Sequence, residues 1–153
     1  MSPAAIMPGE NTVKPEPRLT LQSQLHELAR LWSWVEAQAA ALGIPADTEF
    51  ASQLCLEEAI SNVIRHGHGG QPNLAITVDC TTPAGTQEVV FAIEDHAPPF
   101  NPLAADDVPL PSSIDQVRPG GRGIPLLRKF AGSLAYQRLP GGNRLTIGFA
   151  LPR

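Results

Sequence analysis

Three polar side chains recur at intervals of four residues in the segment 54–70, LCLEEAISNVIRHGHGG: Glu58, Asn62 and His66. On an α-helix this spacing places them along one stripe. An amide oxygen suits Mg²⁺, which prefers oxygen ligands and keeps several waters, and a carboxylate one turn away can accept a proton. The alternative is a solvated polar face of an amphipathic helix, which is the commoner explanation of an isolated Glu/Asn pair.

A second candidate group stands at the end of an apolar strand pattern. The segment 92–100, AIEDHAPPF, passes from strand-forming residues to Asp95 and then into a stiff, proline-rich turn. A carboxylate at a strand end can accept a hydrogen bond from an exocyclic amine at the floor of an apolar pocket. Taken alone, however, an Asp before a proline-containing turn is common, because Asp often stabilises turns without any role in binding.

A third candidate group is the glycine-rich segment 119–127, PGGRGIPLL. Gly121 and Gly123 let backbone N–H groups approach a ligand closely, and Pro125 suits the first turn of a helix. Such a helix start attracts anions, and Arg122 adds a charge that can contact phosphate. The segment is not a P-loop, because no Gly-Lys-Ser/Thr follows, and a plain turn is the alternative.

The order of these three groups is more specific than any one of them. A long Pro- and Asp-rich stretch, 98–119, separates the second group from the third, and loops of this length inside a compact domain are usually lids or binding loops. A metal-binding helix, an acidic pocket floor, a lid and a phosphate loop together predict one nucleotide site.

Hydrophobic periodicity predicts the elements that bring these groups together. We expect an edge strand at 18–22, a helix from the cap Ser23 to Gly43, a second helix from Pro45, and a hairpin of strands 73–79 and 88–95. A short helix after Gly123 and a hairpin around 140–142 complete the chain. The order β-α-α-β-β-lid-α-β-β predicts an α+β, two-layer sandwich over 18–153, whereas the proline-rich segment 1–17 is expected to be a flexible tail.

Composition excludes several classes of protein. The 153 residues suit one domain, and a formal charge of −4 without a basic patch argues against nucleic-acid binding. No window approaches the ~20 apolar residues of a membrane span, and no signal-peptide pattern opens the chain, so a cytoplasmic protein without membrane contact is expected. Cys55 and Cys80 are predicted to be buried free thiols.

The three groups and their order resemble the Bergerat, or histidine-kinase-like ATPase, fold, and most closely the small anti-sigma-factor serine-protein kinases of bacteria. The segment 58–67, EAISNVIRHG, is similar to the N box of that family. DHAPPF (95–100) resembles its first glycine box, GRGI (121–124) its second, and GGNRLT (141–146) its last hairpin. The resemblance covers roughly residues 18–151 and implies a mixed sheet with helices on one face.

The resemblance also implies roles for individual residues. Asn62 would coordinate Mg²⁺ on the phosphates of ATP, Glu58 would be the general base toward a serine hydroxyl of a partner protein, and Asp95 would bind the adenine amino group. Ala97 stands where the family usually has glycine, and its methyl group could crowd the nucleotide. The residues expected to contact the nucleotide are Asn62, Asp95, Ala97, Gly121, Arg122, Gly123, Ile124 and Thr146.

The function that the resemblance implies is that of an anti-sigma factor with serine-protein kinase activity. It would phosphorylate a STAS-domain anti-anti-sigma protein and sequester a sigma factor, and a homodimer is compatible with the family. One alternative is a nucleotide-binding partner-switching module with little or no kinase activity, which Ala97 favours slightly. Another is the catalytic half of a sensor histidine kinase, which is disfavoured because no dimerisation helix with a phosphoacceptor histidine is apparent in the sequence.

Overall fold

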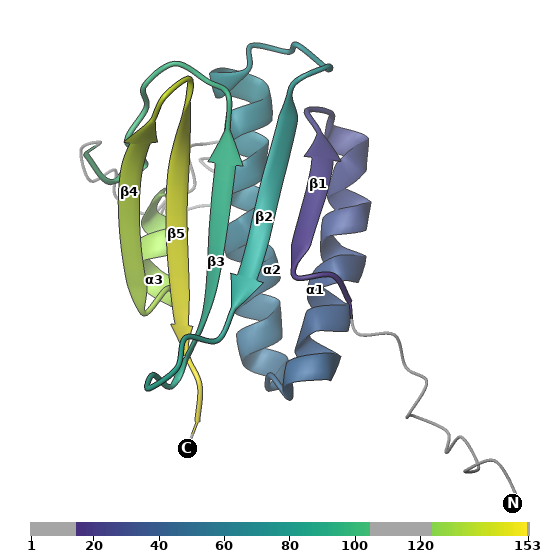
Figure 1. Cartoon of the computed structure of the whole chain (residues 1–153), viewed down its shortest axis with the longest axis vertical. Coiled ribbons are helices and arrows are strands. Elements are labelled where there is room, and N and C mark those ends of the chain that lie inside the picture. The colour runs from purple at the N-terminus through teal and green to yellow at the C-terminus, as the bar shows by residue number, and fades with distance from the viewer. Residues whose placement is uncertain (1–14, 105–123, 153) are drawn as a thin grey trace, which may run out of the picture.

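The computed structural model describes residues 15–104 and 124–152, and these form two layers, with one sheet covered on one face by helices (Figure 1). The strands are β1 (Arg18–Gln22), β2 (Ala75–Thr81), β3 (Glu88–Asp95), β4 (Ser133–Leu139) and β5 (Gly142–Ala150). The helices are α1 (Leu28–Leu42), α2 (Ala46–Asn62) and α3 (Ile124–Phe130), with the 3₁₀ turns η1 (Leu25–Glu27) and η3 (Pro102–Ala104) and the π-helical turn η2 (Val63–Gly67). The α+β two-layer sandwich predicted from the sequence is confirmed.

The sheet has the strand order β1-β2-β3-β5-β4, and all four pairings among the described residues are antiparallel. The expectation of a mixed sheet is therefore corrected. The chain does cross over from β3 through α3 to β4, and β4 runs in the same direction as β3. However, β5 folds back from β4 and lies between these two strands, so the crossover creates no parallel pair.

Side chains along each strand point alternately to the two faces of the sheet, and those on the helix-covered face form the core. The helix-facing positions include fully buried Phe91, Ile93 and Ile147. Phe91 makes edge-to-face contacts with Trp34 of α1 and Phe149 of β5, at centroid distances of 6.2 Å and 6.1 Å. Such contacts stabilise beyond the area that they bury, so Phe91 links α1 to the two central strands β3 and β5.

The ends of the helices test two sequence predictions. Gly43 closes α1 in the left-handed conformation, with φ 67°, as expected of a glycine after a helix. Ser23 does not cap the helix, because the 3₁₀ turn η1 begins two residues later and the Ser23 hydroxyl pairs with His68 instead. Across the two described segments, none of the helices has the length and apolar character needed to cross a membrane.

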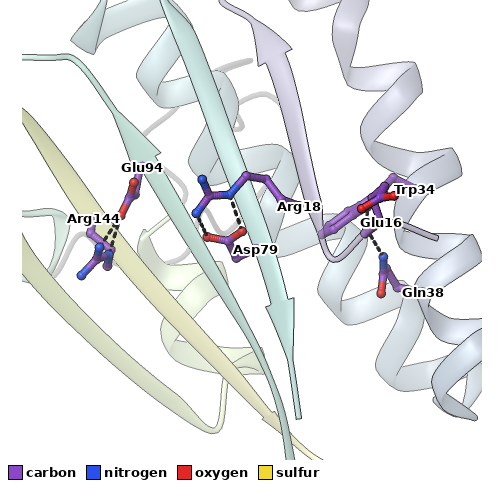
Figure 2. A network of polar contacts seen from close by, with 7 residues as sticks. All are labelled: Glu16, Arg18, Trp34, Gln38, Asp79, Glu94 and Arg144. Carbon is purple, nitrogen blue, oxygen red and sulfur yellow. Dashed lines mark hydrogen bonds and ion pairs between the residues drawn. The ribbon is translucent and has the colours of Figure 1, made fainter. Parts of the chain in front are cut away.

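The two residues before β1, Glu16 and Pro17, are hydrogen-bonded to other elements of the fold. The Glu16 carbonyl accepts hydrogen bonds from Trp34 Nε1 at 2.8 Å and from Gln38 Nε2 at 2.7 Å, which Figure 2 shows beside the cross-strand pairs Arg18–Asp79 and Arg144–Glu94. The carbonyl of Pro17 also accepts from the backbone N–H of Cys80 at 2.8 Å. Both residues were assigned to the tail, yet they are anchored to α1 and β2, which proline content alone does not reveal.

Both cysteines are buried free thiols, as predicted. Burial raises the pKa of the Cys55 thiol to about 11 and that of Cys80 to about 12. Neither thiol is therefore a nucleophile near neutral pH, since only the thiolate reacts.

Replacing Trp34 by Phe keeps an aromatic ring against Phe91 but removes the hydrogen bond to Glu16. We expect Trp34→Phe to lower the free energy of unfolding by about 0.5–1.5 kcal/mol, measured by urea denaturation. Trp32→Phe is the matched control, because the indole of Trp32 makes no hydrogen bond within the described residues. Equal losses in the two variants would contradict anchoring through Glu16.

Candidate functional site

A cavity of about 280 Å³ lies where the end of α2, the end of β3, α3 and the β4–β5 hairpin meet. This volume is near the lower end of the range for small-molecule pockets. Its lining residues are Ala59, Asn62, Val63, His66, Gly67, Ile93, Asp95, Ala97, Pro98, Pro99, Phe100, Pro102, Leu127, Tyr136, Asn143 and Leu145. The walls are mainly aliphatic, and the polar groups are few.

The cavity brings together residues from all three predicted groups. Asn62, the last residue of α2, is buried and lines it with Asp95 and with Leu127 of the glycine-rich segment. Ile124 is the first residue of α3. Gly121, Arg122 and Gly123 lie outside the described residues, so their predicted roles are untested.

Glu58 does not line the cavity but lies one turn before Asn62 on α2. On the same side of this helix, Cys55 Sγ lies 3.9 Å from the carbonyl oxygen of Leu126, so α3 packs beside this stripe. Glu58 is half-buried, and loss of water raises the pKa of its carboxyl above the ordinary value. The charge of Glu57 adds to this effect, whereas Arg65 opposes it. The carboxylate is thus placed beside α3 and is a stronger base than an exposed Glu.

The helix that carries these residues ends in a π-helical turn, which the sequence pattern did not reveal. In η2 the backbone N–H of His68 donates to the carbonyl of Val63 at 2.7 Å, five residues back. Such turns are rare and occur often at functional sites. Here the wider turn presents Val63, His66 and Gly67 to the cavity, which agrees with the predicted position of His66 near the site.

Ala97 is buried, and Gly67 provides the room for its methyl group. A Cβ added at Gly67 would lie only 2.9 Å from the Cβ of Ala97, closer than two carbon atoms normally approach. The extra methyl group in the 95–100 turn is therefore matched by a missing side chain at the end of η2. This packing offsets part of the crowding expected from Ala97.

Asp95 is held by two donors on one of its oxygens. Oδ1 accepts the backbone N–H of Ala97 at 2.9 Å and the side-chain amide of Asn143 at 3.0 Å. No described residue donates a hydrogen bond to Oδ2. One carboxylate oxygen is thus used to fix the side chain, and the other can accept a hydrogen bond from a ligand in the cavity.

Asn143 connects Asp95 to the rest of the turn. Its Nδ2 also donates to the carbonyl of Pro98 at 3.0 Å, and its Oδ1 accepts from the backbone N–H of Phe100 at 3.3 Å and from the Tyr136 hydroxyl. The side chain is 4% exposed. A buried amide that satisfies backbone donors and acceptors fixes the conformation of the segment it bridges.

Sequence reasoning missed Asn143 and Tyr136 as site residues. Both come from the β4–β5 hairpin, and Asn143 is the strand partner of Asp95 across the β3–β5 pairing. The adjacent Gly142 was a signal, because a Cβ there would collide with the carbonyl oxygen of Asp95. It was interpreted only as part of a hairpin turn, and single-sequence patterns do not show which strands pair.

Thr146, which was expected to contact the nucleotide, is not brought to the cavity. Asn143, Leu145 and Ile147 point to the helix-covered side of β5, so Thr146 points to the opposite face by strand alternation. Its backbone pairs with Ala92 and Ala135. We therefore do not assign Thr146 to the site.

The donor set determines which metal the site could hold. The described residues contain no cluster of three or more His, Cys, Asp or Glu side chains, so they offer no ready-made cage for a transition metal. One amide oxygen from Asn62 fits Mg²⁺, which commonly uses one or two protein ligands with substrate phosphates and waters. The cavity itself fits a flat heterocycle whose exocyclic amine faces Asp95.

Comparison with known proteins agrees with this geometry. Residues 21–149 match the family described as Histidine kinase-like ATPase domain. The chain is also 33% identical over 114 residues to the serine/threonine-protein kinase BtrW of Bordetella bronchiseptica, a match that covers 74% of this chain and 79% of that protein.

Two solved structures share the fold. The RsbU and RsbW domains of Rv1364c from Mycobacterium tuberculosis superpose with a TM-score of 0.60 at 14% identity, over 91% of this chain and 34% of that chain. The histidine kinase domain of the blue-light activated histidine kinase from Erythrobacter litoralis EL346 superposes with a TM-score of 0.51 at 14% identity, over 79% and 61% of the two chains. The present chain thus spans about a third of the first structure and about three fifths of the second.

Removing the Asn143 amide should destabilise the whole turn. We expect Asn143→Ala to lower the free energy of unfolding by about 1–3 kcal/mol, because backbone groups at Pro98 and Phe100 lose their partner. Tyr136→Phe removes only one of these hydrogen bonds and should cost less. Chemical denaturation of both variants is the measurement. Gln137→Ala is the control and should cost less than about 0.5 kcal/mol, because the hydrogen bond from Arg144 that it removes is exposed to solvent. A loss no larger for Asn143→Ala than for Gln137→Ala would refute the bridging role.

Proposed function

The chain belongs to the histidine kinase-like ATPase family, and we propose that it is an ATP-dependent serine-protein kinase of the anti-sigma type. Its proposed substrate is a STAS-domain anti-anti-sigma protein, and its second proposed partner is a sigma factor that it sequesters. The observation that carries the proposal is the cavity in which Asn62, Asp95 and Leu127 of α3 meet, with Glu58 one turn before Asn62. The identity to a serine/threonine-protein kinase supports the same reaction class.

Adenine would occupy the described cavity. Aliphatic walls such as Ile93 and Leu145 suit a flat aromatic ring, and the open Oδ2 of Asp95 would accept a hydrogen bond from the amino group. The carboxylate rejects a guanine, whose oxygen at the equivalent position is an acceptor and would face another acceptor. Asp95 therefore selects the base.

The phosphates would extend from the cavity toward the start of α3. Asn62 would coordinate Mg²⁺, which neutralises phosphate charge when it is bound. Gly121, Gly123 and Ile124 are proposed to supply backbone N–H groups to the phosphates, and Arg122 to supply a positive charge.

Glu58 would accept the proton of the serine hydroxyl as that oxygen attacks the terminal phosphorus. The oxygen–phosphorus bond to ADP then breaks, so the phosphoryl group moves to serine. A base must be deprotonated to act, and burial raises the pKa of Glu58. The rate is therefore expected to rise with pH through that raised pKa and to level off above it.

Glu58→Gln should abolish phosphoryl transfer while leaving Mg-ATP affinity within about threefold, since Glu58 lies outside the cavity. Transfer of labelled phosphate to a STAS protein gives the rate, and calorimetry gives the affinity. Glu57→Gln is the matched control, because its side chain points about 100° away on the same helix. Wild-type transfer by Glu58→Gln would remove Glu58 from its proposed role.

Asn62→Ala should weaken nucleotide binding in the presence of Mg²⁺ much more than in its absence, because the variant loses a metal ligand. Calorimetric titrations with and without the metal measure the difference. If magnesium strengthens nucleotide binding equally in Asn62→Ala and the wild type, Asn62 is not a metal ligand.

A second candidate function is a nucleotide-binding partner-switching module with little kinase activity. The observation that favours it is Ala97, which lines the cavity at a position where, by the resemblance, the family usually has glycine. Nucleotide-dependent binding of the STAS protein without label transfer would support this alternative. Sedimentation of the same samples tests the proposed homodimer.

A further inference from the structure

His68 is a buried histidine that bridges two distant segments beside the site. The side chain is 4% exposed. Its Nδ1 lies 2.8 Å from the hydroxyl oxygen of Ser23, in the connection between β1 and α1. Its Nε2 accepts the backbone N–H of His96 at 3.1 Å, in the turn directly after Asp95.

These two contacts fix the protonation state of the ring. A backbone N–H only donates, so Nε2 must be the unprotonated nitrogen that accepts. In the neutral ring the proton then sits on Nδ1 and is donated to Ser23 Oγ. The arrangement thus requires the neutral Nδ1–H tautomer.

Protonation would disrupt the second contact. An imidazolium carries a proton on Nε2 as well, and this proton would point at the N–H of His96, placing two donors against each other. The turn that begins at His96 continues into Ala97, whose N–H fixes Asp95 Oδ1. Loss of the His68 contact therefore removes one support of the turn that orients Asp95, while the hydrogen bond from Asn143 to Asp95 remains.

Within residues 15–104 and 124–152, the titratable groups that face His68 are Asp95 and His96. Asp95 favours the charged ring, whereas His96, whose ring stacks at a centroid distance of 6.5 Å, disfavours it. Ser23, on the other side, is uncharged. Burial is the largest influence and lowers the pKa of His68 below its ordinary value. The structure therefore favours the neutral ring near pH 7.

We propose that His68 is a positioning residue for nucleotide binding: its neutral Nδ1–H form ties the turn after β3 to Ser23 and holds Asp95 toward the cavity. The inference rests on the proposed ATP site. It makes nucleotide affinity dependent on pH, with the site assembled above the titration range of His68 and loosened below it.

The direction follows from proton linkage. His68 takes up a proton more readily when its contact with the His96 N–H is broken than when it is made. Acid therefore shifts the population toward the form in which the turn is loosened. Apparent affinity scales with the assembled fraction, which falls up to about tenfold for each pH unit below the pKa of His68. The folded chain loses stability in the same direction, since the unfolded histidine takes up a proton at higher pH than the buried one.

The tautomer is tested first, by ¹⁵N chemical shifts of the imidazole in the nucleotide-free protein near neutral pH. The expected result is a neutral ring with the proton on Nδ1, and Ser23→Ala should weaken that preference, whereas Ser23→Thr should keep it. A ring with its proton on Nε2, the form usually preferred in water, would overturn the inference.

Nucleotide affinity is tested second, by calorimetry with Mg-ADP at about pH 7.5 and about pH 5, with circular dichroism confirming the fold at both. His68→Gln retains an acceptor oxygen but does not titrate, so it should bind within about threefold of the wild type at the higher pH. From the higher to the lower pH, the wild type should lose affinity several-fold more than His68→Gln. Protonation of the nucleotide affects both proteins equally and cancels in the ratio.

His96→Gln is the matched control, because it removes the neighbouring ring but keeps the backbone N–H that His68 accepts. This variant should still lose affinity in acid more than His68→Gln does, with the loss beginning at slightly higher pH because the ring that disfavours charged His68 is gone. If the wild type and His68→Gln both bind Mg-ADP and lose the same affinity between the two pH values, the role of His68 is overturned and the proposed function is not. Absence of nucleotide binding in the wild type at either pH would instead overturn the proposed function, and with it the role of His68.

Discussion

The hydrogen bonds of the Asn143 side chain are the interaction on which the site depends. One amide fixes Asp95 Oδ1, the carbonyl of Pro98 and the N–H of Phe100, so a turn with two consecutive prolines is held by a residue from another strand. The turn cannot pair with a strand of its own, because proline has no N–H to donate. A buried amide with both donors and acceptors replaces that missing pairing, and it orients Asp95 at the same time.

Close packing supports this polar bridge. Gly142 lets β5 approach the carbonyl of Asp95, and Gly67 leaves space for the methyl group of Ala97. Both glycines act by having no side chain rather than by an unusual backbone angle, since neither is among the glycines with positive φ. The cavity therefore depends on small residues from two elements as much as on its polar groups.

Much of the fold follows from local patterns. The strand 88–95 and the glycine after α1 were predicted correctly, because alternation and a left-handed C-terminal glycine are local signals. The antiparallel order of the sheet and the anchoring of Glu16 were not, because both depend on contacts distant in sequence. The π-helical turn was also missed, because the hydrophobic pattern does not distinguish it from the preceding α-helix. For the site, Asn62 and Asp95 were placed in one cavity as expected, whereas Asn143 and Tyr136 depend on strand pairing and were missed. Thr146 was misplaced because the resemblance of the hairpin did not fix which way each residue of β5 points.

The pairing of β3 with β5 has a consequence for folding. Asp95 and Asn143 are 48 residues apart, so the chain must close a long loop before the two side chains meet. Such contacts form late, because the chain loses the entropy of closing the loop before the contact stabilises it. A folding intermediate with β1, β2, β3 and the first two helices in place would contain most of the core but no binding cavity. Competence to bind a ligand would then appear with the last step of folding, and a nascent chain would acquire it only after β5 had been synthesised.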